Sequence, residues 1–164
     1  MRKMVSNAPY QKVVFAGTFD RLHPGHKHLL KTALQLGEEL GIGLTADKMI
    51  EGKDDFEKIQ TYEERKASLV EFLKNESEWD RCSIFRIETV AGGADKMEEL
   101  DALIVSDEIS VVDNALKINE MRFENGLKRF HIIIVPRVRT KDGRPLSSSR
   151  LRDGEKYDDK ELIY

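Results

Sequence analysis

The stretch that decides the fold is GTFDRLHPGH, residues 17–26, which lies between an apolar run at residues 12–16 and a helical pattern. The apolar run is β-branched and aromatic, as in a buried strand, and it ends at Gly17, where the chain must turn. From Pro24 to Leu40, leucine and alanine recur on one face of a helix, and Pro24 suits the first turn. The sequence therefore predicts a central strand, a glycine-containing loop and a helix.

Short apolar runs and helical patterns alternate along the rest of the chain, which is typical of strands and helices wound into a parallel sheet. We expect one α/β domain over residues 1–164, with a Rossmann-like, doubly wound, five-stranded parallel sheet in the order 3-2-1-4-5. The charged tails at 1–10 and 153–164 are expected to be loosely ordered. Further strands are expected at 42–45, 83–90, 102–106 and 131–135, a polar loop at 47–60, and helices from 61, from about 113 to Gly126, and from Ser147.

Composition excludes several classes of protein. The length of 164 residues suits one core, and the net charge of −3 gives no overall basic field for nucleic acid or an anionic membrane. No apolar stretch approaches the ~18 residues of a membrane span, and the basic N-terminus lacks the apolar centre of a signal peptide. With a single cysteine, Cys82, no intrachain disulfide is possible. We expect a cytoplasmic protein that binds neither nucleic acid nor membrane.

The chemistry of the loop at 17–26 suits phosphate. Ligands of open parallel sheets bind beyond the carboxyl ends of the strands, where this loop lies. Gly17 and Gly25 allow close approach of a ligand, and the free amides and dipole of the following helix favour anions. His23 and His26 can donate hydrogen bonds to phosphate oxygens. As a metal pair they lack a cluster of Cys, Asp or Glu beside them, so we expect no metal held by the protein.

Two motifs together carry a family resemblance. Residues 17–26 resemble the HxGH signature of the nucleotidylyltransferase superfamily, and LSSSRLR at residues 146–152 resembles its second signature, ISSTxxR. The details GTFDRLHPGHKHLL, YEER at 62–65 and RTKDGRPLSSSRLRDGE are most similar to the archaeal and eukaryotic type of phosphopantetheine adenylyltransferase. The resemblance implies the nucleotidylyltransferase fold and transfer of AMP from ATP to 4′-phosphopantetheine, which gives dephospho-coenzyme A and pyrophosphate.

The resemblance also implies roles for individual residues. His23, His26 and a lysine would act in catalysis, Lys53 being favoured over Lys48, and Mg²⁺ would be held mainly by the ATP phosphates and water. Thr18, Lys53 and Arg122 would bind the acceptor substrate. The residues expected to bind ATP are Gly17, Thr18, Phe19, His23, Gly25, His26, Ser147, Ser148, Ser149 and Arg152.

Some positions carry an alternative interpretation. The ring of Phe19 is expected to pack rather than to stack on a base, and Asp20 to pin the loop by accepting backbone amides. Arg122 could instead form an ordinary salt bridge on a helix surface. Glu108 is a candidate site residue to which the resemblance assigns no definite role.

Other functions share the two motifs. Glycerol-3-phosphate cytidylyltransferase and FMN or NMN adenylyltransferases use the same chemistry, and a catalytically silent nucleotide-binding module would keep the fold alone. Neither the identity of the acceptor nor the oligomeric state follows from these motifs.

Overall fold

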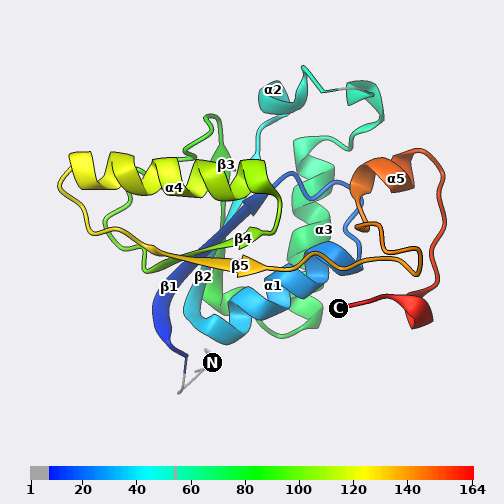
Figure 1. The fold of residues 1–164 in the computed structure, drawn as a ribbon, viewed down its shortest axis with the longest axis horizontal. Coiled ribbons are helices and arrows are strands. Elements are labelled where there is room, and N and C mark those ends of the chain that lie inside the picture. The colour runs from blue at the N-terminus through cyan, green and yellow to red at the C-terminus, as the bar shows by residue number, and fades with distance from the viewer. Residues whose placement is uncertain (1–7, 54) are drawn as a thin grey trace.

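The computed structural model describes residues 8–53 and 55–164, which form a five-stranded, fully parallel sheet in the order β3-β2-β1-β4-β5 (Figure 1). The predicted strand order is confirmed. β1 lies in the centre, so the order reverses between β1 and β4 and opens a crevice at their carboxyl ends. The elements are β1 (Tyr10–Gly17), α1 (Pro24–Leu36), β2 (Gly37–Thr45), α2 (Asp47–Ile50), the short 3-10 helix η1 (Phe56–Lys58), α3 (Tyr62–Asn75), η2 (Trp79–Arg81), β3 (Cys82–Ile87), β4 (Ala102–Ser106), α4 (Ile109–Glu124), β5 (His131–Val135), α5 (Ser148–Arg152) and η3 (Asp159–Glu161).

The boundary between α1 and β2 differs from the prediction. The helix ends at Leu36 rather than at Leu40, and β2 begins at Gly37 instead of residue 42. A Cβ atom on Gly37 would lie 2.6 Å from a methyl carbon of Val13, so only glycine lets the chain pass this close to β1. Leu40 points into the core as a strand residue, and its match to the helical spacing was coincidental.

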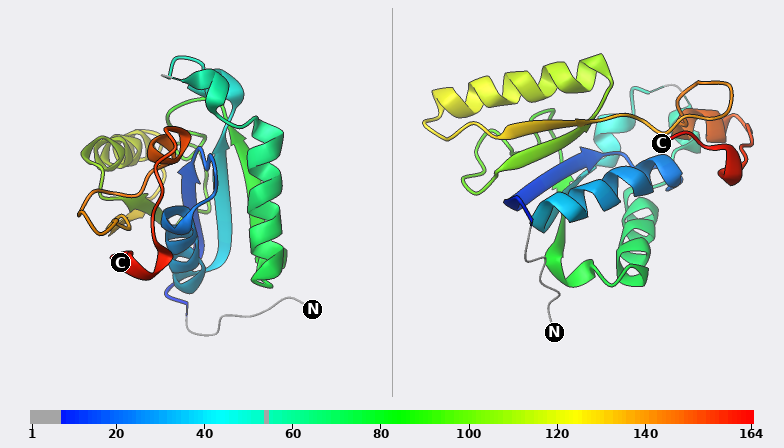
Figure 2. Two further views of the ribbon diagram at one scale, coloured as in Figure 1. Left: turned by 90° about the vertical axis from the view of Figure 1, so that its right-hand side faces the viewer. Right: turned by 60° about the horizontal axis from the view of Figure 1, so that its bottom comes forward.

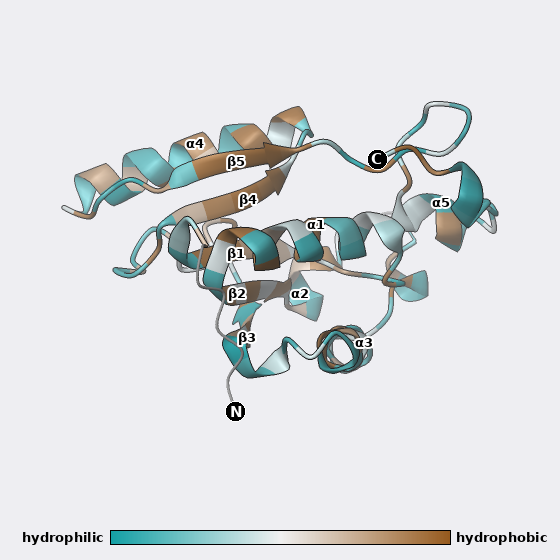
Figure 3. Cartoon of the chain, turned by 90° about the horizontal axis from the view of Figure 1, so that it is seen from below, coloured by the Kyte–Doolittle hydropathy of each residue, from teal (hydrophilic) through white to brown (hydrophobic). Residues whose placement is uncertain are grey.

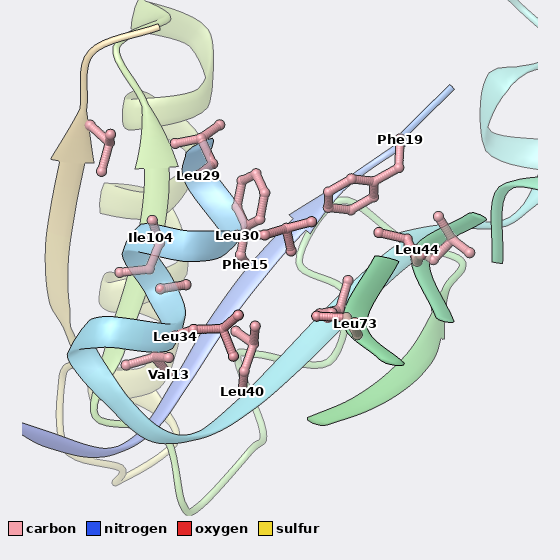
Figure 4. Close-up of a cluster of buried hydrophobic side chains, with 14 of the residues drawn as sticks. Val13, Phe15, Phe19, Leu29, Leu30, Leu34, Leu40, Leu44, Leu73 and Ile104 are labelled. Atoms are coloured by element: carbon pink, nitrogen blue, oxygen red, sulfur yellow. The ribbon is translucent and has the colours of Figure 1, made fainter. Parts of the chain in front are cut away.

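Two apolar layers hold the sheet between its helices. On one face, α1 and α3 pack their leucines against β1, β2 and β4 (Figure 4), and on the other face α4 packs against β1 and β4. Figure 2 shows the helices on both sides of the sheet, and Figure 3 shows β4 and β5 almost uniformly hydrophobic while the helices alternate. Strands covered on both faces explain the continuous apolar runs in the sequence.

Several local predictions are confirmed. Thr61 caps α3 through a capping box with Glu64, and Gly126 follows α4 with a φ of 74°, in the left-handed region. Ser147 caps α5 by accepting the amide of Arg150. The predicted bounds of two elements were wrong, since α4 begins at Ile109 instead of about 113 and β3 ends at Ile87 instead of 90. The expected polar loop contains α2 and η1.

The chain ends also differ from the expected loose tails. Tyr10 is already part of β1, and residues 1–7 lie outside the described residues. At the other end, the backbones of Ile163 and Arg139 exchange hydrogen bonds of 2.8 and 2.9 Å. The Tyr164 ring lies edge-on to His28 of α1, so the C-terminal segment is fastened to the domain. Among the described residues, no helix combines the length and the apolar character needed to cross a bilayer.

Candidate active site

A cleft of about 440 Å³ opens at the carboxyl ends of β1 and β4, where the strand order reverses. Its walls bring together residues that are far apart in the sequence. The first group comes from the loop after β1, the second from β4 and the start of α4, and the third from the segment leading into α5. Of the predicted phosphate-binding residues, the cleft is lined by Gly17, Thr18, His23, Gly25, His26, Ser147 and Ser148.

His23 and His26 stack on each other at the start of α1. Their ring centroids are 3.8 Å apart, and backbone amides hold both rings. His23 Nδ1 accepts the Gly25 amide at 3.0 Å, and His26 Nδ1 accepts the His23 amide at 3.3 Å. Because Nδ1 is the acceptor in both rings, the proton of each neutral imidazole lies on Nε2. Each ring is therefore fixed as an Nε2 donor.

Both histidines are neutral at physiological pH. Burial lowers the pKa of His23 to about 4, against the opposing effect of Asp20, and burial together with the neighbouring His23 lowers the pKa of His26 well below its usual range. Gly25 makes this arrangement possible, because a Cβ atom there would lie only 2.8 Å from His23 Cε1. Two neutral donors at a helix N-terminus suit an anionic ligand.

A lysine and a threonine meet on the neighbouring wall. Lys53 Nζ donates to Thr18 Oγ1 at 3.3 Å, whereas Lys48 pairs with Glu88 at 3.6 Å on the surface. Burial and the nearby Arg152 and Arg65 lower the pKa of Lys53. The structure thus brings Lys53, and not Lys48, to the loop after β1.

Asp20 fastens this loop to the second motif. Its carboxylate, 1% exposed, accepts the Gln60 amide at 2.8 Å and pairs with both Arg152 at 2.7 Å and Arg21 at 2.8 Å. Burial alone would raise the pKa of Asp20, but these three donors together lower it. Ser148 Oγ also donates to the Asp20 carbonyl at 2.6 Å. Figures 1 and 2 show the result, with α5 lying beside the loop that follows β1.

The loop is strained at two residues between these anchors. Phe19 and Arg21 have φ values of 54° and 50°, which are uncommon for residues with a side chain. The Phe19 ring is buried and packs edge-on against Phe15, 5.2 Å between centroids (Figure 4). The predicted packing role of Phe19 is confirmed, and its ring is not available to a nucleotide base. Core packing on one side and the Asp20 contacts on the other hold the backbone in this conformation.

Comparison with known proteins agrees with this geometry. The family model described as Cytidylyltransferase-like matches residues 14–154. A phosphopantetheine adenylyltransferase from Thermococcus gammatolerans is 41% identical over 146 residues, 89% of this chain and 90% of the relative. One from Methanopyrus kandleri is 41% identical over 151 residues, 91% of this chain and 93% of the relative. The chain belongs to the phosphopantetheine adenylyltransferase family.

Solved structures with the same fold extend beyond this adenylyltransferase family. A protein of unknown function from Archaeoglobus fulgidus superposes with a TM-score of 0.67 at 28% identity, covering 76% of this chain and 89% of that one. A tyrosyl-tRNA synthetase from the same organism has a TM-score of 0.64 at 14% identity, covering 90% of this chain and 61% of that one. At that identity the likeness shows the fold alone.

The structure places Arg122 away from the cleft, where it was expected to bind the acceptor substrate. Its guanidinium is fully buried and donates to the carbonyls of Lys128, Ala94 and Met97, at 2.6 to 2.8 Å. The residue is 13 positions beyond Ile109, so at 1.5 Å per residue it lies about 20 Å from the end of α4 that faces the cleft. Arg122 packs the far end of the domain and is not among the described residues that line the cleft. The surface salt bridge considered for it is not formed either.

Two other residues of the second motif stand apart from the cleft walls. The Ser149 hydroxyl is 3.1 Å from that of Ser147, and its residue is exposed. Arg152 lies on Asp20, behind the loop. Both remain predictions as ATP ligands.

The structure also adds Arg137, which the sequence did not indicate, and places it beside Glu108, which it did. Arg137 and Glu108 line the cleft and pair at 3.0 Å, and Arg137 also contacts Asp107 at 2.7 Å. Arg137 is the second residue after β5, and a charged residue so close to the end of a parallel strand was the available signal. One wall of the cleft is apolar, with Val105, Val111 and Ala115 among its residues. Burial raises the pKa of the Cys82 thiol to about 12, which argues against a nucleophilic role.

Proposed function

We propose that this chain transfers AMP from ATP to the phosphate of 4′-phosphopantetheine, forming dephospho-coenzyme A and pyrophosphate. The observation that carries the proposal is the stacked pair His23 and His26, two neutral Nε2 donors that share one cleft with Ser147 and Ser148 at the start of α5. The relatives named phosphopantetheine adenylyltransferase support the choice of reaction.

The reaction needs positioning and charge stabilisation rather than a covalent enzyme intermediate. A phosphate oxygen of the acceptor attacks the α-phosphorus of ATP, the new P–O bond forms, and the bond to the β-phosphate oxygen breaks as pyrophosphate leaves. The Nε2–H groups of His23 and His26 donate to the oxygens on which negative charge grows. Neutral rings suit this role, because they donate hydrogen bonds to the phosphates without transferring a proton to them.

The cations and hydroxyls around the histidines would each bind a different phosphate group. Lys53 and the Thr18 hydroxyl, already in contact, would hold the acceptor phosphate beside the α-phosphate. Ser147, Ser148 and Ser149 would receive the β- and γ-phosphates, and Arg152 would neutralise charge behind them. The apolar wall formed by Val105, Val111 and Ala115 would take the uncharged parts of the substrates.

Mg²⁺ fits this site as an ion that arrives with ATP. Of the described residues that line the cleft, Glu108 alone carries a carboxylate, and it is paired with Arg137. Phosphates and water would supply most of the ligands that Mg²⁺ needs, and the ion would offset the charge of the triphosphate. A cytoplasmic location stays a prediction.

The test is pyrophosphate release by the purified protein with Mg²⁺ and either ATP or CTP. The acceptors are 4′-phosphopantetheine, glycerol 3-phosphate, FMN and nicotinamide mononucleotide, and product mass identifies the acceptor used. We expect release only with ATP and 4′-phosphopantetheine. Release with another pair would overturn the substrate assignment, and no release with any pair would favour the catalytically silent module.

A further inference from the structure

A fully buried arginine lies beneath the phosphate loop and is not explained by the reaction itself. Arg65, in the first turn of α3, is 0% exposed. Its guanidinium donates to three main-chain carbonyls, those of Gln60 at 2.9 Å, Thr18 at 3.0 Å and Thr45 at 2.9 Å. It also pairs with Asp47 at 2.9 Å. One side chain therefore joins the loop after β1, the end of β2 and both ends of the lysine-bearing segment 47–60.

A short chain of hydroxyls leads from this guanidinium into the cleft. Arg65 Nη1 donates to Thr45 Oγ1 at 3.4 Å, and the Thr45 hydroxyl donates to Thr18 Oγ1 at 3.1 Å. Lys53 Nζ donates to the same Thr18 oxygen at 3.3 Å. A threonine oxygen has two lone pairs and one proton. With both lone pairs engaged, the Thr18 hydroxyl has only its proton to offer a ligand.

We propose that Arg65 and Thr45 are positioning residues, which hold the Thr18 hydroxyl as a hydrogen-bond donor and hold Lys53 beside it. The inference rests on the proposed function, since the ligand of this donor is the acceptor phosphate. A phosphate oxygen accepts hydrogen bonds, so a threonine whose rotation is limited to donation suits it. Removing the restraint frees the hydroxyl to turn away from the substrate.

Arginine is needed at position 65 because of its shape. The planar guanidinium reaches acceptors on several sides at once, whereas a lysine ammonium is a single point on a flexible stem. A lysine at this position keeps the charge but can satisfy only part of the set. The buried carbonyls left over then lose their donor, and the three segments lose their common anchor.

Thr45 offers the cleaner test, because valine preserves its shape and its β-branched character while removing the hydroxyl. We expect Thr45→Val to lower kcat for dephospho-coenzyme A formation roughly three- to tenfold, with KM for ATP changed less than twofold, as for an interaction made in the transition state. Thr45→Ser, which keeps the hydroxyl, should have a kcat near the wild-type value.

A double-mutant cycle separates positioning from a general structural effect. If Thr45 acts through the Thr18 hydroxyl, adding Thr45→Val to Thr18→Val causes no further loss of kcat. Equal losses in both backgrounds would show that Thr45 acts independently of Thr18 and would overturn the inference. An unchanged kcat in Thr45→Val alone would do the same.

Arg65→Lys tests the guanidinium against a matched buried arginine. Arg81, 5% exposed, holds the carbonyls of Gly37 and Leu34 at the opposite end of the sheet. Arg65→Lys should lower kcat at least tenfold, whereas Arg81→Lys should lower the melting temperature and leave kcat within twofold. Equal retention of kcat in both variants would overturn the role of Arg65, and the threonine cycle decides the matter if Arg65→Lys does not fold. If the wild-type protein showed no turnover, the proposed function itself would be overturned. This result differs from an active wild type whose variants keep the same kcat, which would overturn only the positioning role.

Discussion

The contact between Gly25 and His23 allows a quantitative prediction. An alanine at position 25 would place its Cβ atom 2.8 Å from His23 Cε1 and 3.0 Å from Nδ1. Carbon atoms pack at about 3.5 Å or more, so the imidazole must retreat by about 0.7 Å. This shift also lengthens the bond between the Gly25 amide and Nδ1, which is now 3.0 Å and fixes the proton on Nε2.

The expected effect on catalysis follows from this displacement. A misplacement of about 1 Å in a catalytic group costs roughly 100-fold, so Gly25→Ala should lower kcat/KM by roughly 10- to 100-fold. Stability should change little, because alanine in place of glycine stabilises a helix by up to about 1 kcal/mol and loss of the cap costs about the same. Steady-state pyrophosphate release and thermal unfolding of the same preparation measure the two effects.

A second glycine provides the opposite control. Gly126, after α4, has a φ of 74° and open space around it. Gly126→Ala should therefore cost about 1 kcal/mol of stability through backbone strain and leave kcat/KM unchanged. If Gly25→Ala kept kcat/KM within twofold of wild type, the fixed position of His23 would not matter for the reaction, and the assignment of the histidine pair would fail.

Three further predictions test the histidines and Arg122. His26→Ala should retain the fold and lower kcat by two or more orders of magnitude, as loss of a transition-state donor does; His28→Ala on the same helix is the control, and near-normal turnover of His26→Ala would contradict the role. The folded protein holds the pKa of His23 at about 4, below its ordinary value of 6.5. The unfolded chain therefore binds more protons at His23 between these values, and this residue alone should lower the free energy of unfolding by roughly 3 kcal/mol as the pH drops from 6.5 to 4. Urea titrations should show that the free energy of unfolding falls less with decreasing pH for His23→Asn than for the wild type, and an equal fall in both proteins would refute the burial argument. Asp20, whose pKa is lowered, changes the stability only below about pH 4. Arg122→Met should cost roughly 2–4 kcal/mol of stability and leave KM for 4′-phosphopantetheine unchanged, whereas a raised KM in a folded variant would restore its predicted phosphate contact.

The fold and the centre of the site were predictable because their signals are local. The run at 12–16, the capping residues of α3 and α5, and glycine-flanked histidines at a strand end each act within a few residues of sequence. What failed depends on contacts across the chain. The end of α1 is set by the approach of Gly37 to Val13, and the C-terminal segment is held by Arg139.

Arg65 and Arg122 show why buried arginines are hard to assign from sequence. Each places its guanidinium against three main-chain carbonyls. Because every residue has a main-chain carbonyl, the sequence does not indicate which residues supply these acceptors. On their helices both resemble ordinary surface cations. Without the structure, neither the buried network at position 65 nor the purely structural role at position 122 can be told from a salt bridge in solvent.

The direction of each helix nevertheless separates these two arginines. In a parallel sheet, the helix after a strand begins near the carboxyl end of that strand, where the ligand binds, and runs back toward the opposite end. Arg65 is in the first turn of α3, whereas Arg122 is in the last turn of α4. Only the first can therefore touch the loop after β1. Position along the helix, counted from its start, is thus a better guide to function in this fold than the type of charged residue.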